Sequence, residues 1–328
     1  MPLQELTGEE FIMDTLVQIT VICEDQEKGK KALEKAFAAY QRINNLTDRF
    51  PKGEPAASSS SDVIRLNENA GTKPVKVSAD TIKIIQRSHY YAGLTGGSFD
   101  VSIGPVMDRW GFGKSKQCVP TDEEISRALS LVDYSKVEVD PGKATVFLSK
   151  PGMSLDLGGV AKGYATDEAV KVLRELGIKH AMINAGGNVY ALGSKSDGSP
   201  WRVGIQDPRS NGGIIAILSL KDSAAVTSGD YQRCFEQGGV RYHHIISPST
   251  GKQARDLIQT TVVAESATDA DILSTTLFVL GPQLGMSFVQ GLPGTGAIFI
   301  GPDKLVSSTA NLTNQLTFTG DGGYQTAR

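Results

Sequence analysis

The chain has 328 residues, enough to bury a large core in one domain or in two intertwined ones. Hydrophobic residues make up 40% of it, charged residues 21%, and 36 residues are glycine, a composition typical of a globular protein with many tight turns. The formal net charge of −3 gives no basic footprint, so we expect no nucleic-acid partner.

Cysteine and histidine usage argues against two kinds of site. The three cysteines are far apart and odd in number, so we expect free thiols. Without CxxC or HExxH, a zinc site is not expected. No apolar run approaches the roughly 20 residues of a bilayer span. Residues 1–11 do not resemble a signal peptide, which fits a cytoplasmic protein or a chain whose export segment was removed.

Hydrophobic periodicity and turn residues predict the elements of the first half. In chain order these are a strand over 13–23, an amphipathic helix over 27–45, a flexible polar loop at 51–61, a helix from Ser78 to about Gly96, a short helix opened by a Thr121–Glu124 capping box, and a hairpin of 136–140 with 144–149.

The second half begins with a helix from about Val160 to Leu176 that is closed by Gly177. The predicted strands are 180–185, 201–207, 214–220, 242–247, 260–265 and 297–301, and two helices are predicted over 268–281 and 283–290. Strands and helices mix without regular βαβ alternation, so we expect an α+β fold.

Two glycine-rich segments could approach a ligand closely. LDLGGVAKGYATDEA (155–169) is predicted to join a strand to a helix, where paired glycines and helix N–H groups suit phosphate and Lys162 adds a cation. It matches neither GxxxxGK[ST] nor GxGxxG, and a tight turn packed for its own sake is equally compatible. For INAGGNVYALG (183–193) the local pattern favours a plain hairpin turn flanked by Asn184 and Asn188.

Aromatic and histidine residues supply weaker indications. The non-periodic segment 96–113 carries Trp110 and Phe112, which could stack on a flat heterocycle or anchor a loop in the core. His243 and His244 are predicted at the head of a strand, where only one of them can face a given site. Either histidine could transfer protons at neutral pH.

The segment TDADILSTTLFVLG (268–281) places several oxygens at the start of a predicted buried helix. Thr268 and Asp271 match a capping box, which the local pattern favours. Asp271 and Thr275, however, stand at i and i+4 and share one helix face. A carboxylate and a hydroxyl on one face suit Mg²⁺, which takes oxygen ligands.

Taken in order, these segments resemble the ApbE family of flavin transferases, which use FAD to attach FMN to other proteins. The resemblance spans about residues 13–300 and suggests a single catalytic domain. The matching segments are MDT (13–15), FDVSIGPVMDRWGF (99–112), DLGGVAKGYATD (156–167), INAGGNVYALG (183–193), WRVGIQDP (201–208), VTSGDYQR (226–233), HHIISPSTGK (243–252) and ADILSTTLFVLG (270–281).

The resemblance implies a two-lobed α+β fold of mixed and antiparallel sheets flanked by helices, with FAD in a cleft between the lobes. It implies Mg²⁺ bound by Asp271, Thr275 and the main-chain carbonyl of Ala161, bridging the FAD pyrophosphate. It also makes His244 the candidate for proton transfer, a duty that Asp271 could share. The residues it places at the flavin and its phosphates are Met13, Thr15, Trp110, Phe112, Asp156, Gly158, Gly159, Lys162, Asn184, Gly186, Gly187, Ser228 and Tyr231.

The implied reaction moves FMN to a Ser or Thr of a target flavoprotein, such as a subunit of a membrane redox complex, and releases AMP. Two alternatives stay open: an FAD pyrophosphatase that forms FMN and AMP, and a non-catalytic flavin-binding protein. The resemblance implies a location outside the cytoplasmic membrane if an export signal is missing here, and a cytoplasmic one otherwise. Two departures are Ser247, where the family usually has Asp after His-Ile-Ile, and Val17, where it often has an aromatic residue.

Overall fold

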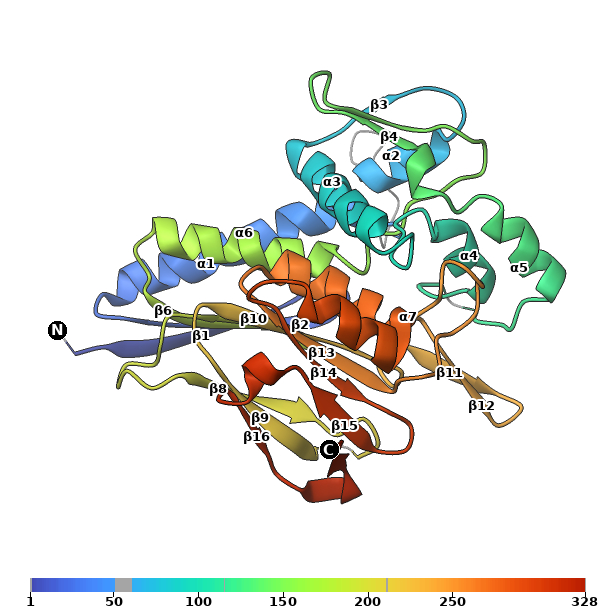
Figure 1. Cartoon of the computed structure of the whole chain (residues 1–328). Helices are drawn as coiled ribbons and strands as arrows, with labels where there is room; N and C mark the ends of the chain where they lie inside the picture. The colour runs from blue at the N-terminus through green and yellow to red at the C-terminus, as the bar shows by residue number, and fades with distance from the viewer. Residues whose placement is uncertain (1, 51–60, 115, 211, 328) are drawn as a thin grey trace. The chain divides into compact units, whose positions relative to one another are not determined.

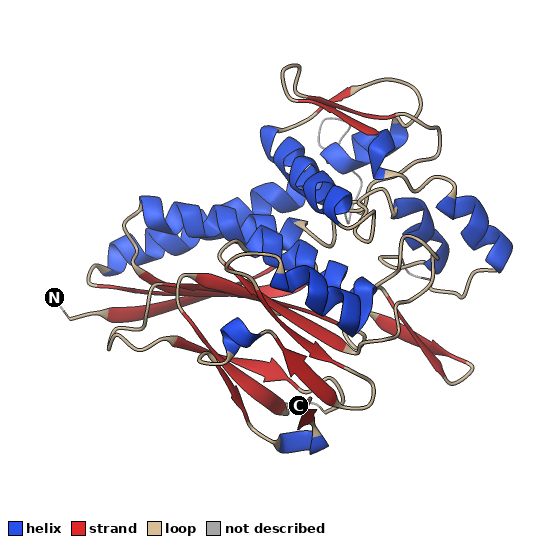
Figure 2. Cartoon of the chain, in the orientation of Figure 1, coloured by secondary structure: helices blue, strands red, loops and turns tan. Residues whose placement is uncertain are grey.

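The computed structural model describes residues 2–50, 61–114, 116–210 and 212–327. Apart from Ser61, the loop predicted at 51–61 lies outside these residues. The expected α+β class is confirmed, because helices and mixed sheets both contribute (Figure 2). The chain forms two compact units: residues 1–42, 162–231 and 255–328 make the first, and residues 43–161 and 232–254 the second.

The first unit is built on a nine-stranded sheet in the order β1-β2-β6-β7-β10-β13-β14-β15-β17. Neighbouring strands are antiparallel, except that β15 and β17 are parallel. These strands are β1 (Gln4–Ile12), β2 (Thr15–Cys23), β6 (His180–Ala185), β7 (Asn188–Leu192), β10 (Ser223–Gly229), β13 (Gln259–Ala264), β14 (Gly296–Ile300), β15 (Leu305–Ser308) and β17 (Gln325–Thr326).

Helices and a second sheet cover the two faces of this large sheet (Figures 1 and 2). The helices α1 (Gln26–Thr47), α6 (Ala161–Glu175) and α7 (Ala267–Gln290) lie on one face, where α7 packs on β10, β13 and β14. The sheet of β8 (Trp201–Gln206), β9 (Ile214–Leu220) and β16 (Leu316–Phe318) packs on the other through a core that includes Ile205, Leu218 and Val263. The central strands β7, β13 and β14 are therefore buried on both faces of the sheet.

Helix α7 consists of two helical segments. Gly281 has φ of 76° and is followed by Pro282, so the helix breaks where the sequence predicts two separate helices. Among the described residues, α7 is the one helix that length and composition would allow to span a membrane. The sequence analysis expected no apolar run of that length, and this expectation is corrected. Half of the apolar stretch is buried inside the protein, however, and the core helix of a globular protein has the same length and composition.

The second unit is smaller and more irregular. Its helices are α2 (Asp62–Glu68), α3 (Ala79–Leu94), α4 (Gly104–Trp110) and α5 (Asp122–Leu129), and its strands are β3 (Val75–Lys76), β4 (Val137–Asp140), β5 (Thr145–Leu148), β11 (Cys234–Gln237) and β12 (Val240–His243). The predicted Thr121–Glu124 capping box is present at α5, and β4 and β5 form the predicted hairpin. The prediction of an irregular loop over the whole of 96–113 is wrong, because α4 lies inside this segment.

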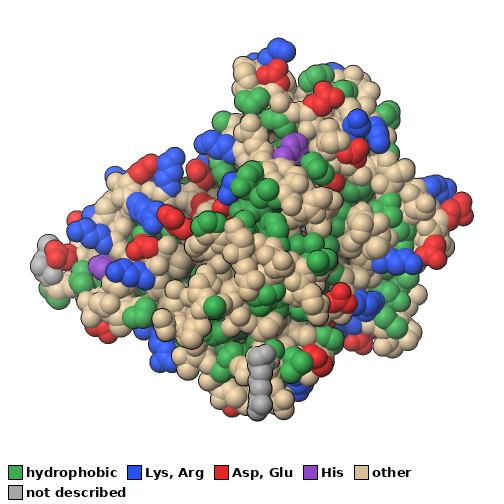
Figure 3. All heavy atoms as spheres, in the orientation of Figure 1, with side chains coloured by type: hydrophobic (Ala, Val, Ile, Leu, Met, Phe, Trp, Pro, Cys, Tyr) green, Lys and Arg blue, Asp and Glu red, His purple; other side chains and the backbone are tan. Residues whose placement is uncertain are grey.

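The surface agrees with the small net charge. On the face that Figure 3 shows, acidic and basic side chains are interspersed over both helical and irregular segments.

The long strand β1 was not predicted at all. It pairs along its whole length with β2, so the strand expected from residue 13 begins at Thr15 and follows a turn at Met13 and Asp14.

Candidate active site

In the first unit, the turn between β1 and β2 touches the turn between β6 and β7. Met13 and Asp14 form the first turn, both with φ of 56°, a left-handed conformation that is uncommon outside glycine. A Cβ at Gly186 of the other turn would lie 2.1 Å from Oγ1 of Thr15, so only glycine fits there. Two segments predicted to border the flavin are therefore in contact.

Strand β10 brings a third segment that was predicted to bind FAD to the same end of the neighbouring strands. Thr227 donates its N–H to the carbonyl oxygen of Gly187 at 3.2 Å, and Ser228 and Tyr231 follow along the chain. Asn184 supports the turn, since its Oδ1 atom accepts the N–H of Gly187 at 3.3 Å. The strand register thus brings the segments around Thr15, Gly186 and Thr227 to the same end of neighbouring strands, although they lie far apart in the sequence.

Helices α6 and α7 approach each other closely at Gly163. A Cβ there would lie 2.2 Å from the carbonyl oxygen of Ala267 and 2.7 Å from Cβ of Asp271. The N–H of Gly163 donates to Oδ2 of Asp271 at 2.8 Å. The carboxylate of Asp271 therefore faces the first turn of α6, which Lys162 shares.

Asp271 is almost fully buried, with 5% of its surface exposed. Burial raises the pKa of its carboxyl, while the charge of Lys162 and the N–H of Gly163 act in the opposite direction. A cation bound at this carboxylate would favour its ionised form. A positive charge beside this buried carboxylate would therefore lower the pKa of Asp271.

Hydroxyl groups continue from Asp271 along the same face of α7. Thr275 lies one turn later and is partly buried, and its Oγ1 atom lies 3.4 Å from Oγ of Ser228 on β10. Ser228 Oγ also pairs with Oγ of Ser274 at 2.8 Å. The hydroxyls of Ser228, Ser274 and Thr275 therefore line the contact of α7 with β10, while the carboxylate of Asp271 faces α6.

The capping box predicted from Thr268 and Asp271 is wrong. The helix begins at Ala267, and Ser266 is its N-cap. Asp167 of α6 accepts hydrogen bonds from the N–H of Ala267 at 2.8 Å and from the N–H and hydroxyl of Thr268 at 2.9 and 2.6 Å. Ser266 and Asp167 therefore cap α7, and Asp271 takes no part in that cap.

Arg209, which no sequence motif indicated, holds the segment after β10 through an ion pair with Asp230. Its guanidinium binds both carboxylate oxygens of Asp230 at 2.7 Å, and this pairing raises the pKa of Arg209. Asp230 immediately precedes Tyr231, so the bidentate pair anchors a predicted flavin-site residue. An arginine following a predicted strand gives no local indication of a partner 21 positions away.

In the second unit, Trp110 and Phe112 belong to the hydrophobic core. Trp110 is 2% exposed, and its Nε1 atom donates to the carbonyl oxygen of Gly251 at 2.8 Å. Phe112 is 5% exposed, and its ring centroid lies 5.9 Å from that of Phe235 and 6.4 Å from that of His244. These contacts give both aromatics a role in the core, and their contact with flavin stays a prediction.

The two histidines lie at the end of a strand, so the prediction that they begin one is wrong. His243 is the last residue of β12 and is 3% exposed. His244 follows the strand, is partly buried and presents its ring edge-on to Phe112. As expected, the two side chains have different surroundings, and proton transfer by His244 stays a prediction.

The turn before α6 is irregular, whereas the sequence predicts a strand there. Oδ1 of Asp156 accepts the N–H of Gly158 at 2.9 Å, and Gly158 and Gly159 are at least partly exposed. The carbonyl of Leu157 accepts the N–H of Ala161 at 2.9 Å, which starts the helix. Phosphate contacts of the two glycines stay predictions.

Within the described residues, no group of three or more His, Cys, Asp or Glu side chains could hold a metal. The magnesium set implied by the resemblance needs only one carboxylate, from Asp271, with the hydroxyl of Thr275 and the carbonyl of Ala161. All three donors are oxygens, and Mg²⁺ in proteins commonly keeps waters or substrate phosphates for its remaining positions. The chemistry of these residues therefore fits Mg²⁺, whose presence stays a proposal.

Comparison with known proteins places this arrangement in a family. The model of the ApbE family matches residues 13–299. The FAD:protein FMN transferase of Treponema pallidum is 33% identical over 95% of this chain and 89% of that protein. The enzyme of the same name from Klebsiella pneumoniae is 34% identical over 88% of this chain and 90% of its own.

Two solved structures indicate the same family. The ApbE protein of Thermotoga maritima has a TM-score of 0.87 at 32% identity, covering 95% of this chain and 99% of that one. The flavin transferase ApbE of Vibrio cholerae has a TM-score of 0.80 at 28% identity, covering 92% and 94%. The family match, the relatives and the superpositions all span most of the chain. The chain therefore belongs to the ApbE family.

Proposed function

We propose that this transferase is a FAD:protein FMN transferase, which moves FMN from FAD to a Ser or Thr hydroxyl of a target flavoprotein. Relatives of that name, similar over nearly the whole chain, support flavin transfer. The observation that carries the proposal is Asp271, buried on α7 and held by Gly163 of α6, with Thr275 one turn further on.

In the proposed reaction, the hydroxyl oxygen of the acceptor attacks the FMN phosphorus of FAD. A new P–O bond forms, the P–O bond to the bridging oxygen breaks, and AMP leaves with that oxygen. The hydroxyl loses its proton to a base, for which His244 is our candidate, and FMN remains as a phosphoester. A hydroxyl is a weak nucleophile, so such a base or a metal has to assist it.

The chain's own groups bind and orient the reactants in this proposal. Lys162 provides a cation for the pyrophosphate at the first turn of α6. Asp271, Thr275 and the carbonyl of Ala161 would hold Mg²⁺, which when bound neutralises charge on the phosphates. The segments around Thr15, Gly186 and Tyr231 would bind the rest of the dinucleotide.

The direct test is incubation of the protein with FAD, Mg²⁺ and a candidate acceptor flavoprotein, followed by measurement of AMP and of the acceptor's mass. We expect AMP and acceptor-bound FMN in equal amounts. Rapid AMP release without acceptor would instead indicate the FAD pyrophosphatase. Stable FAD binding with no AMP under either condition would indicate a flavin-binding protein.

The acceptor and its location belong to the same proposal. We propose that the target is a flavoprotein such as a subunit of a membrane redox complex, modified outside the cytoplasmic membrane if an export segment precedes this chain. Comparing flavinylation of such a subunit in extracytoplasmic and cytoplasmic fractions of cells that express the protein would test both points. Modification confined to the cytoplasmic fraction would contradict the location.

A further inference from the structure

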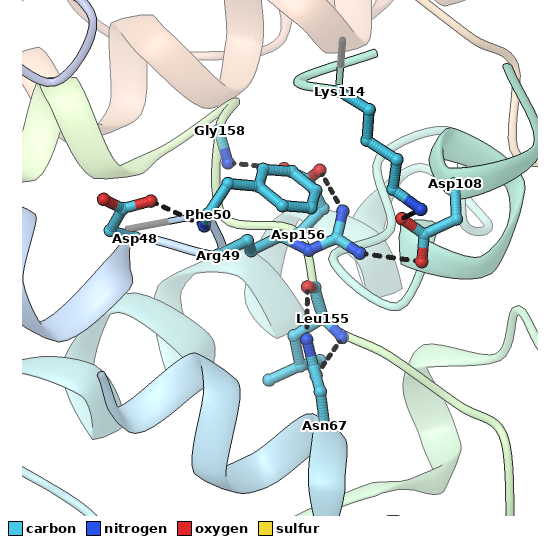
Figure 4. A network of polar contacts seen from close by, with 9 residues as sticks. All are labelled: Asp48, Arg49, Phe50, Asn67, Asp108, Lys114, Leu155, Asp156 and Gly158. Carbon is cyan, nitrogen blue, oxygen red and sulfur yellow. Dashed lines mark hydrogen bonds and ion pairs between the residues drawn. The ribbon is translucent and has the colours of Figure 1, made fainter. Parts of the chain in front are cut away.

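The turn 155–159 of the second unit is held in place by side chains from other segments (Figure 4). Asn67 of α2 forms two hydrogen bonds with the backbone of Leu155: its Nδ2 atom donates to the carbonyl at 3.2 Å, and its Oδ1 atom accepts the N–H at 2.7 Å. Next along the chain, Asp156 donates its N–H to the carbonyl of Val101 at 2.8 Å. The backbone leading into the glycines is thus fixed although it belongs to no strand.

The side chain of Asp156 is held by Arg49, a residue that neither the motifs nor the proposed function uses. Nη1 of Arg49 lies 2.7 Å from Oδ2 of Asp156, and Nη2 lies 3.1 Å from Oδ2 of Asp108. Lys114 pairs with the other oxygen of Asp108 at 2.9 Å. Two cations and two carboxylates therefore form one network without net charge.

The environment of Arg49 suits an arginine specifically. Its side chain is 8% exposed, and its guanidinium lies 5.1 Å from the centroid of the Phe50 ring. A planar guanidinium can bind two carboxylates in different directions and also stack on an aromatic face. A lysine ammonium would keep the charge but lose the fork. Removal of Arg49 would leave the partly buried carboxylate of Asp156 without its ion-pair partner.

Asp156 passes this constraint to the glycines. One carboxylate oxygen binds Arg49 while Oδ1 accepts the N–H of Gly158, which fixes the direction of the chain at Gly158. The carbonyl between these residues, that of Leu157, accepts the N–H of Ala161 and starts α6. The orientation of Asp156 therefore sets the backbone that leads to Ala161.

We propose that Arg49 is a positioning residue for FAD binding, which acts through Asp156 on the glycine turn 157–159. The inference rests on the proposed function, because the phosphate contacts predicted for Gly158 and Gly159 lie in this turn and the metal contact proposed for Ala161 directly follows it. Arg49 pairs with Asp156 and Asp108 and acts on the turn through Asp156. Its contribution is to hold the turn in its binding conformation before FAD arrives, which lowers the free-energy cost of ordering it on binding.

The test compares Arg49→Ala and Arg49→Lys with Lys114→Ala, which breaks only the outer ion pair of the same network. We expect the Kd for FAD, measured with Mg²⁺ and no acceptor, to rise on the order of tenfold to a hundredfold in Arg49→Ala. It should rise less in Arg49→Lys and stay near wild type in Lys114→Ala. Added guanidinium at millimolar concentration should restore part of the affinity of Arg49→Ala, whereas equimolar NaCl should not.

Hydrogen exchange provides a second measurement, which Arg49→Lys permits if Arg49→Ala fails to fold. We expect faster exchange in a peptide spanning 155–160 and unchanged exchange in β4 and β5 of the same unit. Unaltered FAD affinity and exchange in a folded Arg49 variant would overturn the inference. Equally fast exchange throughout the unit would also overturn it, since that indicates a general structural role.

Failure of the inference about Arg49 can be distinguished from failure of the proposed function. If wild-type protein binds FAD but forms neither AMP nor modified acceptor, the proposed function fails while the binding measurements still decide the role of Arg49. If wild-type protein transfers FMN and folded Arg49 variants bind FAD as tightly as wild type, only the inference about Arg49 fails.

Discussion

At the scale of single residues, the function of Asp271 is decided by its surroundings, not by its sequence pattern. The pattern beginning at Thr268 favours a cap, but Asp167 and Ser266 provide the cap instead. Asp271 is left buried, with the N–H of Gly163 on one oxygen and Thr275 one turn later. Burying a carboxylate is costly, and the raised pKa of Asp271 shows that the charge of Lys162 does not fully offset the burial, so such a residue is typical of a functional site.

Asp271→Asn should remove metal-dependent chemistry and preserve the fold. The amide can still accept the N–H of Gly163, but it lacks the charge that a divalent cation needs. We expect AMP release to fall by about two orders of magnitude or more. Because burial raises the pKa of Asp271, losing the charge should not lower the melting temperature. Asp269→Asn on the same helix is the control, and equal losses in both variants would contradict the assignment.

His89 should make the stability depend on pH. Burial lowers its pKa below the ordinary value of 6.5, and its Nε2 atom is buried without a hydrogen-bond partner among the described residues. The unfolded chain binds a proton that the folded chain resists, so this residue lowers the free energy of unfolding as pH falls below about 6.5. In urea titrations, His89→Phe should show a smaller loss than wild type between about pH 7.5 and 5.5. A parallel loss in both proteins would contradict this.

At the scale of elements, the contact of α6 with α7 depends on Gly163. In Gly163→Ala the new methyl group meets the carbonyl oxygen of Ala267, so the helices must separate. We expect a loss of about 1–3 kcal/mol in the free energy of unfolding and a higher Mg²⁺ requirement for AMP release. Gly93→Ala on α3 is the matched control, since no atom lies within 4 Å of a Cβ there. It should be neutral or stabilising, and an equal loss in both variants would rule out the contact as the cause.

The start of α7 depends on Asp167 of α6. Asp167→Ala removes the acceptor of hydrogen bonds from Ser266, Ala267 and Thr268, and partly buried donors then lack a partner. We expect chemical denaturation to show a loss of about 1–3 kcal/mol. The neighbouring Glu168→Ala, which breaks an ion pair with the exposed Arg42, should cost at most about 1 kcal/mol. If Glu168→Ala cost as much as Asp167→Ala, the capping role would be wrong.

Local sequence patterns predict elements that are stabilised by their own residues. The helix expected over 160–176 is present at Ala161–Glu175, and the Thr121–Glu124 capping box forms as expected. Strand β1 was missed because its exposed, charged residues lack a clear alternation, and its structure comes from pairing with β2. Partners distant in the sequence, such as Asp167 for the start of α7, cannot be found from spacing.

At the scale of the whole molecule, the order of the motifs identified what no single motif could. The local pattern around Gly186 favoured a plain hairpin turn, and only the sheet register brings that turn together with the segments of Thr15 and Ser228. Arg49 and Arg209 belong to no recognised motif, and their roles come from tertiary ion pairs. Val17, where the family often has an aromatic residue, is fully buried in β2 and therefore contributes to the core.

We propose that the protein transfers FMN to an acceptor and does not merely bind or hydrolyse FAD. Mass spectrometry of a candidate acceptor flavoprotein, after incubation with this protein, FAD and Mg²⁺, tests it most directly. We predict an acceptor that carries one FMN on a Ser or Thr, AMP in equal amount, and loss of both products with EDTA or in Asp271→Asn. An unmodified acceptor alongside free FMN and AMP would contradict the claim.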